Sequence, residues 1–175
     1  FAYSGRAEAR RDSGKYEEAS SVCDVLILNS ERLESAYNIR GYCKSMLGQL
    51  DESIYDYLSG YDVSETLGLL YNAGRSYERA NRYNDAVLLY NRVIGINSGF
   101  SPAYVSRGCI KYDNQDFFGA LDDWKTASAI GNEKATALLE VEEVKAHDGA
   151  LYLDYKKLVD WCKQQGVEEA KDLPL

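Results

Sequence analysis

The sequence has few of the residues that most enzyme sites and most breaks between helices require. It contains two prolines and one histidine among 175 residues, and so few prolines suit a chain that is almost entirely helical. His147 stands beside Asp148 and Gly149 in a predicted turn, where a lone histidine is most often a solvated residue. No phosphate-binding loop, dinucleotide-binding glycine pattern or nucleophile elbow is present. We therefore predict no catalytic residues and no enzymatic activity.

Cysteines and carboxylates also lack the spacing of a metal site. The four cysteines, Cys23, Cys43, Cys109 and Cys162, are scattered without a C-x-x-C pair. Structural zinc sites need clustered cysteine, histidine or carboxylate ligands, so we predict no metal and no cofactor. Isolated cysteines in helices are typical of small buried apolar residues. They favour a reducing compartment, and we expect a cytoplasmic location. A cell-envelope location would follow if a signal segment precedes Phe1.

An excess of basic residues and a long apolar run are both absent. The formal net charge is −8, whereas a protein that binds phosphate backbones needs a basic face. No apolar stretch approaches the roughly 18 residues that a membrane-spanning helix needs. These features argue against a nucleic-acid partner, an RNA-binding helical repeat included, and against membrane insertion by this chain.

What the sequence does contain is a repeat of 33 or 34 residues, visible at five positions that share the same steps of 34, 33 and 34. We name three of these positions for later use. The first small position holds Ala7, Gly41, Gly74 and Gly108, the second small position holds Ala19, Ser53, Ala86 and Ala120, and the aromatic position holds Cys23, Tyr57, Tyr90 and Trp124. The other two positions hold Tyr3, Tyr37, Leu70 and Tyr104, and Tyr16, Leu50, Tyr83 and Phe117. A period of this length indicates a stacked helical array.

Each repeat reads as a pair of helices. In the third repeat, Leu70, Ala73, Gly74 and Tyr77 are spaced along one helical face, and a second apolar face begins at Tyr83. Between the two faces lies the polar turn 80–82. The spacing predicts four helical hairpins at about 1–34, 35–67, 68–101 and 102–131. The fold class is therefore all-α, a solenoid of stacked helical hairpins.

The small positions have a steric explanation. Glycine inside a helix costs about 1 kcal/mol relative to alanine, yet three of the four repeats carry glycine at the first small position. We infer that the two helices of a hairpin cross closely there. A single hairpin cannot bury its apolar face alone, so the repeats must stack to form a core.

The pattern of large, small and aromatic residues resembles that of the tetratricopeptide-repeat family. The segments Gly14-Lys15-Tyr16-Glu17-Glu18-Ala19 and Asn81-Arg82-Tyr83-Asn84-Asp85-Ala86 match the middle of that motif. The usual proline at the end of each repeat is absent. Its place is taken by Glu31, Glu65, Ser98 and Asn132. The resemblance covers residues 1 to about 132 and implies a right-handed superhelix that binds other proteins.

The remaining residues, 132–175, are expected to form capping helices and a tail. We predict one helix over 132–146, a break at Asp148-Gly149, and a second helix from about Ala150 to Gln165. The stretch from Trp124 to Leu139 is similar to the closing segment of many bacterial tetratricopeptide proteins, so we expect a bacterial source. The first hairpin lacks a polar cap. Its open end would be covered by further repeats before Phe1 or would permit self-association, and the sequence leaves open whether further repeats, a signal segment or an anchor precede Phe1.

In the tetratricopeptide family, ligands contact the first helices of the hairpins, which line the concave groove. Carried onto this sequence, the resemblance implies a groove for a peptide. Its candidate residues are Glu8, Arg11, Asn38, Tyr42, Tyr71, Asn72, Arg75, Arg79 and Tyr112. Tyrosine offers rigid contact area with a polar tip, asparagine can bond an extended backbone, and Arg75 and Arg79, four residues apart, could hold a carboxylate. The family's two-carboxylate clamp also needs lysines that are missing here, so binding of chaperone C-termini is not expected.

We therefore predict an interaction scaffold that binds a peptide or protein segment in its groove. The alternative is a docking or regulatory part of a larger enzyme or of a cell-envelope assembly complex. The bland interpretation of the groove residues, that they are ordinary solvated positions on helices, remains open at this point.

Overall fold

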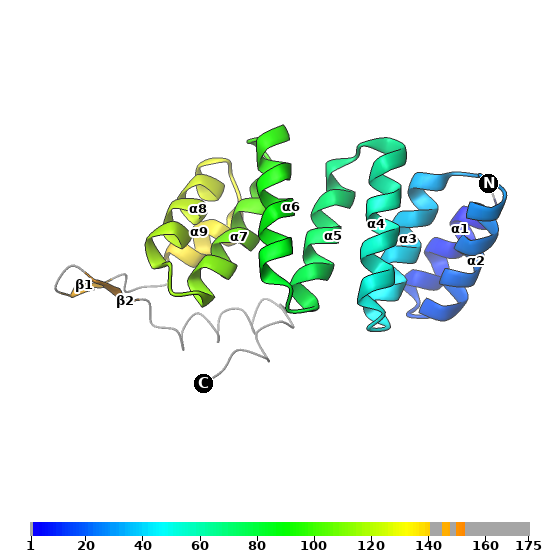
Figure 1. The fold of residues 1–175 in the computed structure, drawn as a ribbon, viewed down its shortest axis with the longest axis horizontal. Coiled ribbons are helices and arrows are strands. Elements are labelled where there is room, and N and C mark those ends of the chain that lie inside the picture. Colours follow the sequence, from blue (N-terminus) through cyan, green and yellow to red (C-terminus); the bar gives the residue numbers. More distant parts are fainter. Residues whose placement is uncertain (1, 141–144, 148–149, 153–175) are drawn as a thin grey trace. The chain divides into compact units, whose positions relative to one another are not determined.

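A computed structural model describes residues 2–140, 145–147 and 150–152 of the chain (Figure 1). Within these residues the chain forms nine α-helices and two short strands. It divides into two compact units, residues 1–98 and residues 99–175, and each unit is described by itself below. The predicted hairpins are present, and the all-helical fold class is confirmed apart from the two strands.

The first unit contains three helical hairpins, which lie side by side in the order of the sequence (Figure 1). Their helices are α1 (Ala2–Asp12) and α2 (Tyr16–Leu28), α3 (Leu33–Met46) and α4 (Leu50–Ser64), and α5 (Leu67–Arg79) and α6 (Tyr83–Ile96). The second helix of one hairpin packs against the first helix of the next, as α2 does on α3 and α4 on α5. The apolar faces seen in the sequence are thereby buried between neighbouring hairpins.

The turn inside each hairpin needs one residue with positive φ. Gly14 (φ 74°) and Gly48 (φ 77°) supply it in the first two hairpins, where glycine carries no steric penalty. Asn81 (φ 57°) supplies it in the third, and Gln115 (φ 65°) in the fourth. Asparagine tolerates this backbone region better than most residues do, whereas glutamine has no such advantage. The turn of the fourth hairpin is therefore strained.

The first small position and the aromatic position form a pair inside each hairpin. The Tyr57 ring lies against Gly41, where an added Cβ would stand 3.1 Å from the ring. The Tyr90 ring lies against Gly74 in the same way, with the corresponding distance only 2.6 Å. A side chain at Gly74 would collide with its ring and one at Gly41 would press on its ring, and both rings are confined, because Tyr57 and Tyr90 are 4% and 0% exposed. The inferred close crossing is confirmed.

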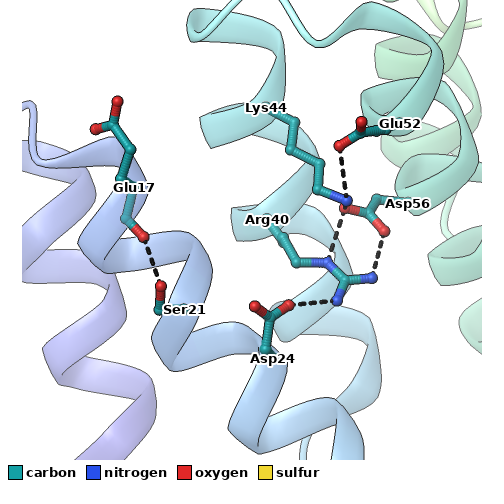
Figure 2. A network of polar contacts seen from close by, with 7 residues as sticks. All are labelled: Glu17, Ser21, Asp24, Arg40, Lys44, Glu52 and Asp56. Atoms are coloured by element: carbon teal, nitrogen blue, oxygen red, sulfur yellow. Dashed lines mark hydrogen bonds and ion pairs between the residues drawn. The ribbon is translucent and has the colours of Figure 1, made fainter.

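A buried ion cluster holds the second hairpin together (Figure 2). Asp56 on α4 has no exposed surface, and it accepts hydrogen bonds from Arg40 Nε at 2.9 Å and Nη2 at 2.6 Å. Lys44 Nζ lies 3.3 Å from the same carboxylate. Arg40 also donates to Asp24 on α2 at 2.7 Å, which ties the second hairpin to the first. Figure 2 shows Arg40 between the two carboxylates and Lys44 between Asp56 and Glu52.

The second unit contains the fourth hairpin, with α7 (Ser101–Asp113) and α8 (Phe117–Ala129), followed by α9 (Glu133–Glu140). It repeats the ion cluster, since Asp123 accepts hydrogen bonds from Arg107 at 2.9 and 2.6 Å and lies 3.0 Å from Lys111. Trp124 at the aromatic position is fully buried over Gly108. The Asn132 side chain accepts a hydrogen bond from Ala135 N at 3.0 Å and so caps α9.

The helix predicted over 132–146 is present as α9 up to Glu140, but its end and the start of the second predicted helix are wrong. Strands β1 (Lys145–His147) and β2 (Ala150–Tyr152) pair antiparallel, with His147 opposite Ala150. We interpreted Asp148-Gly149 as a break between two helices, whereas the described residues on either side of it, 145–147 and 150–152, are strands. Residues 153–165 of the predicted second helix, and the tail, lie outside the described residues. The predicted domain boundaries and the capping role of 132–175 stay predictions.

Across the helices that the structure describes, none is both long and apolar enough to cross a membrane. The same part of the chain holds no group of three or more histidine, cysteine, aspartate or glutamate side chains placed to bind a metal ion.

Candidate functional site

The first helices of the three hairpins in residues 1–98 carry eight of the nine predicted groove residues. Glu8, Asn38, Tyr42 and Arg79 are exposed, whereas Arg11, Tyr71, Asn72 and Arg75 are half-buried. The ninth, Tyr112, is 7% exposed in the core of the second unit, where its ring packs 5.1 Å from Phe117 and 5.7 Å from Trp124 between centroids. The structure therefore places Tyr112 in a hydrophobic core, and we leave it out of the candidate site.

Arg79 is the most available positive charge on this face. It lies in the last turn of α5, and its Nη1 donates a hydrogen bond to the hydroxyl of Ser45 on α3. Within the described residues it forms no ion pair with a carboxylate. A guanidinium offers five N–H donors in a fixed fork, so the single contact with Ser45 leaves donors that can meet a ligand.

Arg75, one turn earlier on α5, is used differently. Its Nε lies 3.8 Å from Glu78 Oε2, and the same oxygen accepts a hydrogen bond of 2.7 Å from the Tyr90 hydroxyl. Burial, followed by the charge of Glu78 and this hydrogen bond, raises the pKa of Tyr90. The Tyr71 ring lies 5.6 Å from the Tyr90 ring between centroids. These side chains form a cluster within the third hairpin, and Arg75 is less free than the sequence suggested.

Tyr57 on α4, which the sequence did not single out as a site residue, lies against α3 next to this face. The pKa of Tyr57 is raised chiefly by burial and also by Tyr42 and Cys43, while Arg79 and Arg75 oppose the rise. The Tyr57 ring lies on Gly41 of α3, one turn before Ser45, and Ser45 accepts a hydrogen bond from Arg79 of α5. Among the described residues, the Tyr57 hydroxyl forms no hydrogen bond. Of the predicted residues, Arg79 is thus held on the turn of α3 that follows the contact between Gly41 and the Tyr57 ring.

The other predicted residues are not joined into one cluster. Tyr42 packs edge-on against Tyr16, with ring centroids 6.1 Å apart, which fixes its position on the face. Asn38 is exposed one turn before Tyr42, and Glu8 is exposed on α1. The site therefore has a centre at Tyr42, Ser45, Tyr57 and Arg79, and we call these four residues the α3–α5 site. The signal that could have revealed Tyr57 is the residue at the position of Glu78 in the second hairpin, which is the short Ser45.

No protein-family model matches the sequence, and no curated protein matches it significantly. Solved structures do match. A crystal structure of MamA is 22% identical with a TM-score of 0.66, covering 74% of this chain and 77% of that one. The first TPR of Spaghetti (RPAP3), bound to the HSP90 peptide SRMEEVD, is 23% identical with a TM-score of 0.54, covering 59% and 85%. YrrB, a TPR protein with an unusual peptide-binding site, is 17% identical with a TM-score of 0.62, covering 96% and 79%.

These likenesses define a class of protein built from stacked helical hairpins. The chain has the fold of tetratricopeptide-repeat proteins, as the 33- and 34-residue steps and the pairing of Gly41 and Gly74 with aromatic rings lead one to expect. The resemblance found in the sequence is confirmed at the level of the fold.

Proposed function

We propose that the chain is a protein-interaction scaffold that binds an acidic peptide segment on the first-helix face of residues 1–98. The observation that carries this proposal is the α3–α5 site, where Arg79 is hydrogen-bonded to Ser45, one turn beyond the contact of Gly41 with the Tyr57 ring. A cation near tyrosine hydroxyls suits a ligand with a carboxylate and an extended backbone.

The face also has the side chains that make contact area without a large entropic cost. Tyr42 is 41% exposed and is held by Tyr16, so a ligand would meet a ring that is already positioned. Asn38, one turn away on α3, can donate to and accept from an extended backbone. The rest of the protein is acidic, with a net charge of −8, and an acidic ligand would therefore favour the face that carries Arg75 and Arg79.

Two of the similar structures support peptide binding as a use of this fold. The first TPR of Spaghetti (RPAP3) is seen with a peptide that contains three acidic residues, and YrrB has a peptide-binding site of its own. At their levels of identity these likenesses speak for the fold, so the α3–α5 site carries the proposal for this chain. The absence of enzymatic activity and the alternative role within a larger assembly stay predictions.

The test is selection from a library of random decapeptides displayed on phage, followed by measurement of affinity for the selected peptides by isothermal titration calorimetry. We expect peptides enriched in Asp and Glu, and a loss of at least tenfold in affinity for Arg79→Glu. Arg79 is preferred to Arg75 because Arg75→Glu would place a second carboxylate beside Glu78 and would disturb the fold.

The control is Lys125→Glu, which makes the same change of charge at an exposed residue on α8. Arg92 is less suitable as a control because its guanidinium lies 5.0 Å from the centre of the Tyr61 ring. Selected peptides without acidic residues, or an equal loss of affinity in Lys125→Glu and Arg79→Glu, would refute the proposal.

A further inference from the structure

The second and third hairpins place the same kind of ring at the same repeat position but treat its hydroxyl differently. Tyr57 and Tyr90 both occupy the aromatic position, 33 residues apart, and each ring lies on the glycine of its own hairpin. The repeat position that faces this hydroxyl holds Ser45 in the second hairpin and Glu78 in the third, again 33 residues apart. This pair of equivalent sites allows a direct comparison within one chain.

In the third hairpin the site is complete. The Tyr90 hydroxyl donates to Glu78 Oε2 at 2.7 Å, and Arg75 Nε lies 3.8 Å from that oxygen. A carboxylate there is held by a phenol and a guanidinium together, and hydrogen bonds to a charged acceptor are stronger than neutral ones. The Glu78 side chain is only 17% exposed, so the carboxylate is part of the folded structure.

In the second hairpin the carboxylate is missing. Ser45 is too short to reach as Glu78 does, and its hydroxyl accepts a hydrogen bond from Arg79 instead. Tyr57 is 4% exposed, and its hydroxyl has no hydrogen-bond partner among the residues that the structure describes. The hydroxyl is not one of the fully buried polar atoms left without a partner there, so it keeps some contact with solvent and can meet a ligand. The donors that hold a carboxylate in the third hairpin, a phenol and a guanidinium, are therefore present in the second without the acceptor.

We propose that Tyr57 and Arg79 form a subsite for one side-chain carboxylate, that of an Asp or Glu in a bound peptide, which takes the place that Glu78 occupies on Tyr90. This inference rests on the proposed function and names the ligand residue that anchors the peptide. The Tyr57 hydroxyl donates one hydrogen bond, the Arg79 guanidinium pairs with the charge, and Ser45 continues to hold Arg79 in place. Tyr42, on the adjoining turn of α3, borders the subsite.

The donor set selects a carboxylate over the amides of Asn and Gln. An amide carbonyl can accept from Tyr57, but it brings no negative charge to pair with the Arg79 guanidinium. A lysine or arginine of a ligand would meet Arg79 and Arg75 with like charge. The subsite should therefore bind Glu more tightly than Gln. This binding should also depend on the Tyr57 hydroxyl, which a general attraction for acidic peptides would not require.

The test uses two small probes that differ only at the side-chain terminus, N-acetyl-glutamate N-methylamide and N-acetyl-glutamine N-methylamide. Binding is followed by two-dimensional ¹H–¹⁵N NMR titration of the whole chain. We expect saturable shifts of the amides of Ser45 and Arg79 with the glutamate probe, and binding of the glutamine probe at least tenfold weaker. Equal affinity for the two probes would overturn the inference.

Two tyrosine variants separate the hydroxyl from the ring. Tyr57→Phe keeps the ring on Gly41, and we expect it to weaken the glutamate probe about tenfold, which is what one hydrogen bond to a charged group is worth. Tyr90→Phe is the matched control, because its hydroxyl is already occupied by Glu78, and the affinity should stay within about twofold. Unchanged binding by Tyr57→Phe would overturn the inference.

A third variant supplies the missing acceptor from within the chain. Ser45→Glu copies the residue of the third hairpin, and its carboxylate should occupy the subsite and abolish binding of the glutamate probe. A folded Ser45→Glu protein that binds this probe as the original does would contradict the inference, and if the variant does not fold, Tyr57→Phe still decides.

The outcome also distinguishes this subsite from the proposed function. Peptides captured through Arg79, with the same affinity for Tyr57→Phe, would leave the scaffold function standing and remove the subsite. Glutamate binding that depends on Tyr57, with no peptide enriched from the library, would remove the function and leave the subsite.

Discussion

The sharpest stability prediction concerns Asp56, the centre of the ion cluster in the second hairpin. Asp56→Leu removes a carboxylate with no exposed surface that accepts two hydrogen bonds from Arg40 and lies 3.3 Å from Lys44. The two cations would remain, with side chains 14% and 17% exposed. Asp24 still pairs with Arg40, but at 54% exposure it compensates only weakly.

The expected loss follows from what is left behind. Removing one partner of a buried ion pair costs about 3–5 kcal/mol, because the remaining charge is buried without compensation. We expect a value near the lower end, about 3 kcal/mol, since Asp24 and Glu52 still approach the two cations. A typical domain is stable by about 5–15 kcal/mol, so this single change would remove a large share of the stability. Urea unfolding followed by circular dichroism measures it.

The third hairpin supplies the control. At the positions of Arg40, Lys44 and Asp56 it carries Ala73, Tyr77 and Leu89, a combination without charge. The triple variant Arg40→Ala, Lys44→Tyr and Asp56→Leu should therefore recover most of the stability lost in Asp56→Leu, since apolar replacements of a whole buried ion group are often neutral. A loss below about 1 kcal/mol in Asp56→Leu would refute the reasoning, and a triple variant no more stable than the single one would show that repacking, not charge, sets the cost.

Three further predictions concern packing, backbone strain and alkaline pH. A methyl group at Gly74 would lie 2.6 Å from the ring packed on it, so Gly74→Ala should cost about 1–3 kcal/mol of stability. Gly95 has nothing within 4 Å of an added Cβ, so Gly95→Ala should instead stabilise α6 by about 0.5–1 kcal/mol. Equal thermal melts of the two variants would contradict this. Gln115→Gly should raise stability by about 1 kcal/mol because φ is 65° there, and an unchanged urea midpoint would contradict that strain. Burial raises the pKa of Cys23 to about 12 and that of Cys43 to about 11, so these thiols stay neutral in the folded state when those of the unfolded chain ionise. Their contribution to the free energy of unfolding is therefore complete below about pH 8.5 and falls as the pH rises. Between neutral pH and about pH 10, a variant with alanine at both cysteines should therefore lose less stability than the original protein does. Identical dependence of stability on pH in the two proteins would refute the assignment.

Much of the fold could be predicted from the sequence because each repeat position occurs four times, so four residues together show whether a position requires a small or a large side chain. Small residues such as Gly74 and large residues such as Tyr90 recur with the same steps, and this fixed the alignment of the four repeats. The positions of the hairpin turns then followed from residues such as Gly48. Gly60 shows the limit of this reasoning. It lies outside the small positions, yet an added Cβ would be 3.1 Å from Tyr37 Cβ and from a Leu69 methyl, because it meets the neighbouring helices at a contact that no repeat position announces.

The candidate site was only partly predictable, for a physical reason. The repeat shows which face a residue lies on, so the prediction placed Arg79 and Tyr42 on the first helices. It cannot show where the end of a long side chain points. Tyr57 belongs to the core by its ring and to the surface by its hydroxyl, and Tyr112, assigned to the groove, turns into the core beside Trp124. The strands at 145–147 and 150–152 were missed because segments this short have no periodicity that separates a strand from the end of a helix.

The ion clusters have a consequence for how such a chain can change over generations. In the second hairpin Arg40, Lys44 and Asp56 all belong to that hairpin, and in the fourth Arg107, Lys111 and Asp123 do so again. In each group the buried aspartate is paired with cations of its own hairpin, and Arg40 also reaches Asp24, which is 54% exposed. A gene segment that encodes one of these hairpins therefore carries both the buried carboxylate and the cations that pair with it, which makes the hairpin itself the unit that recombination can move.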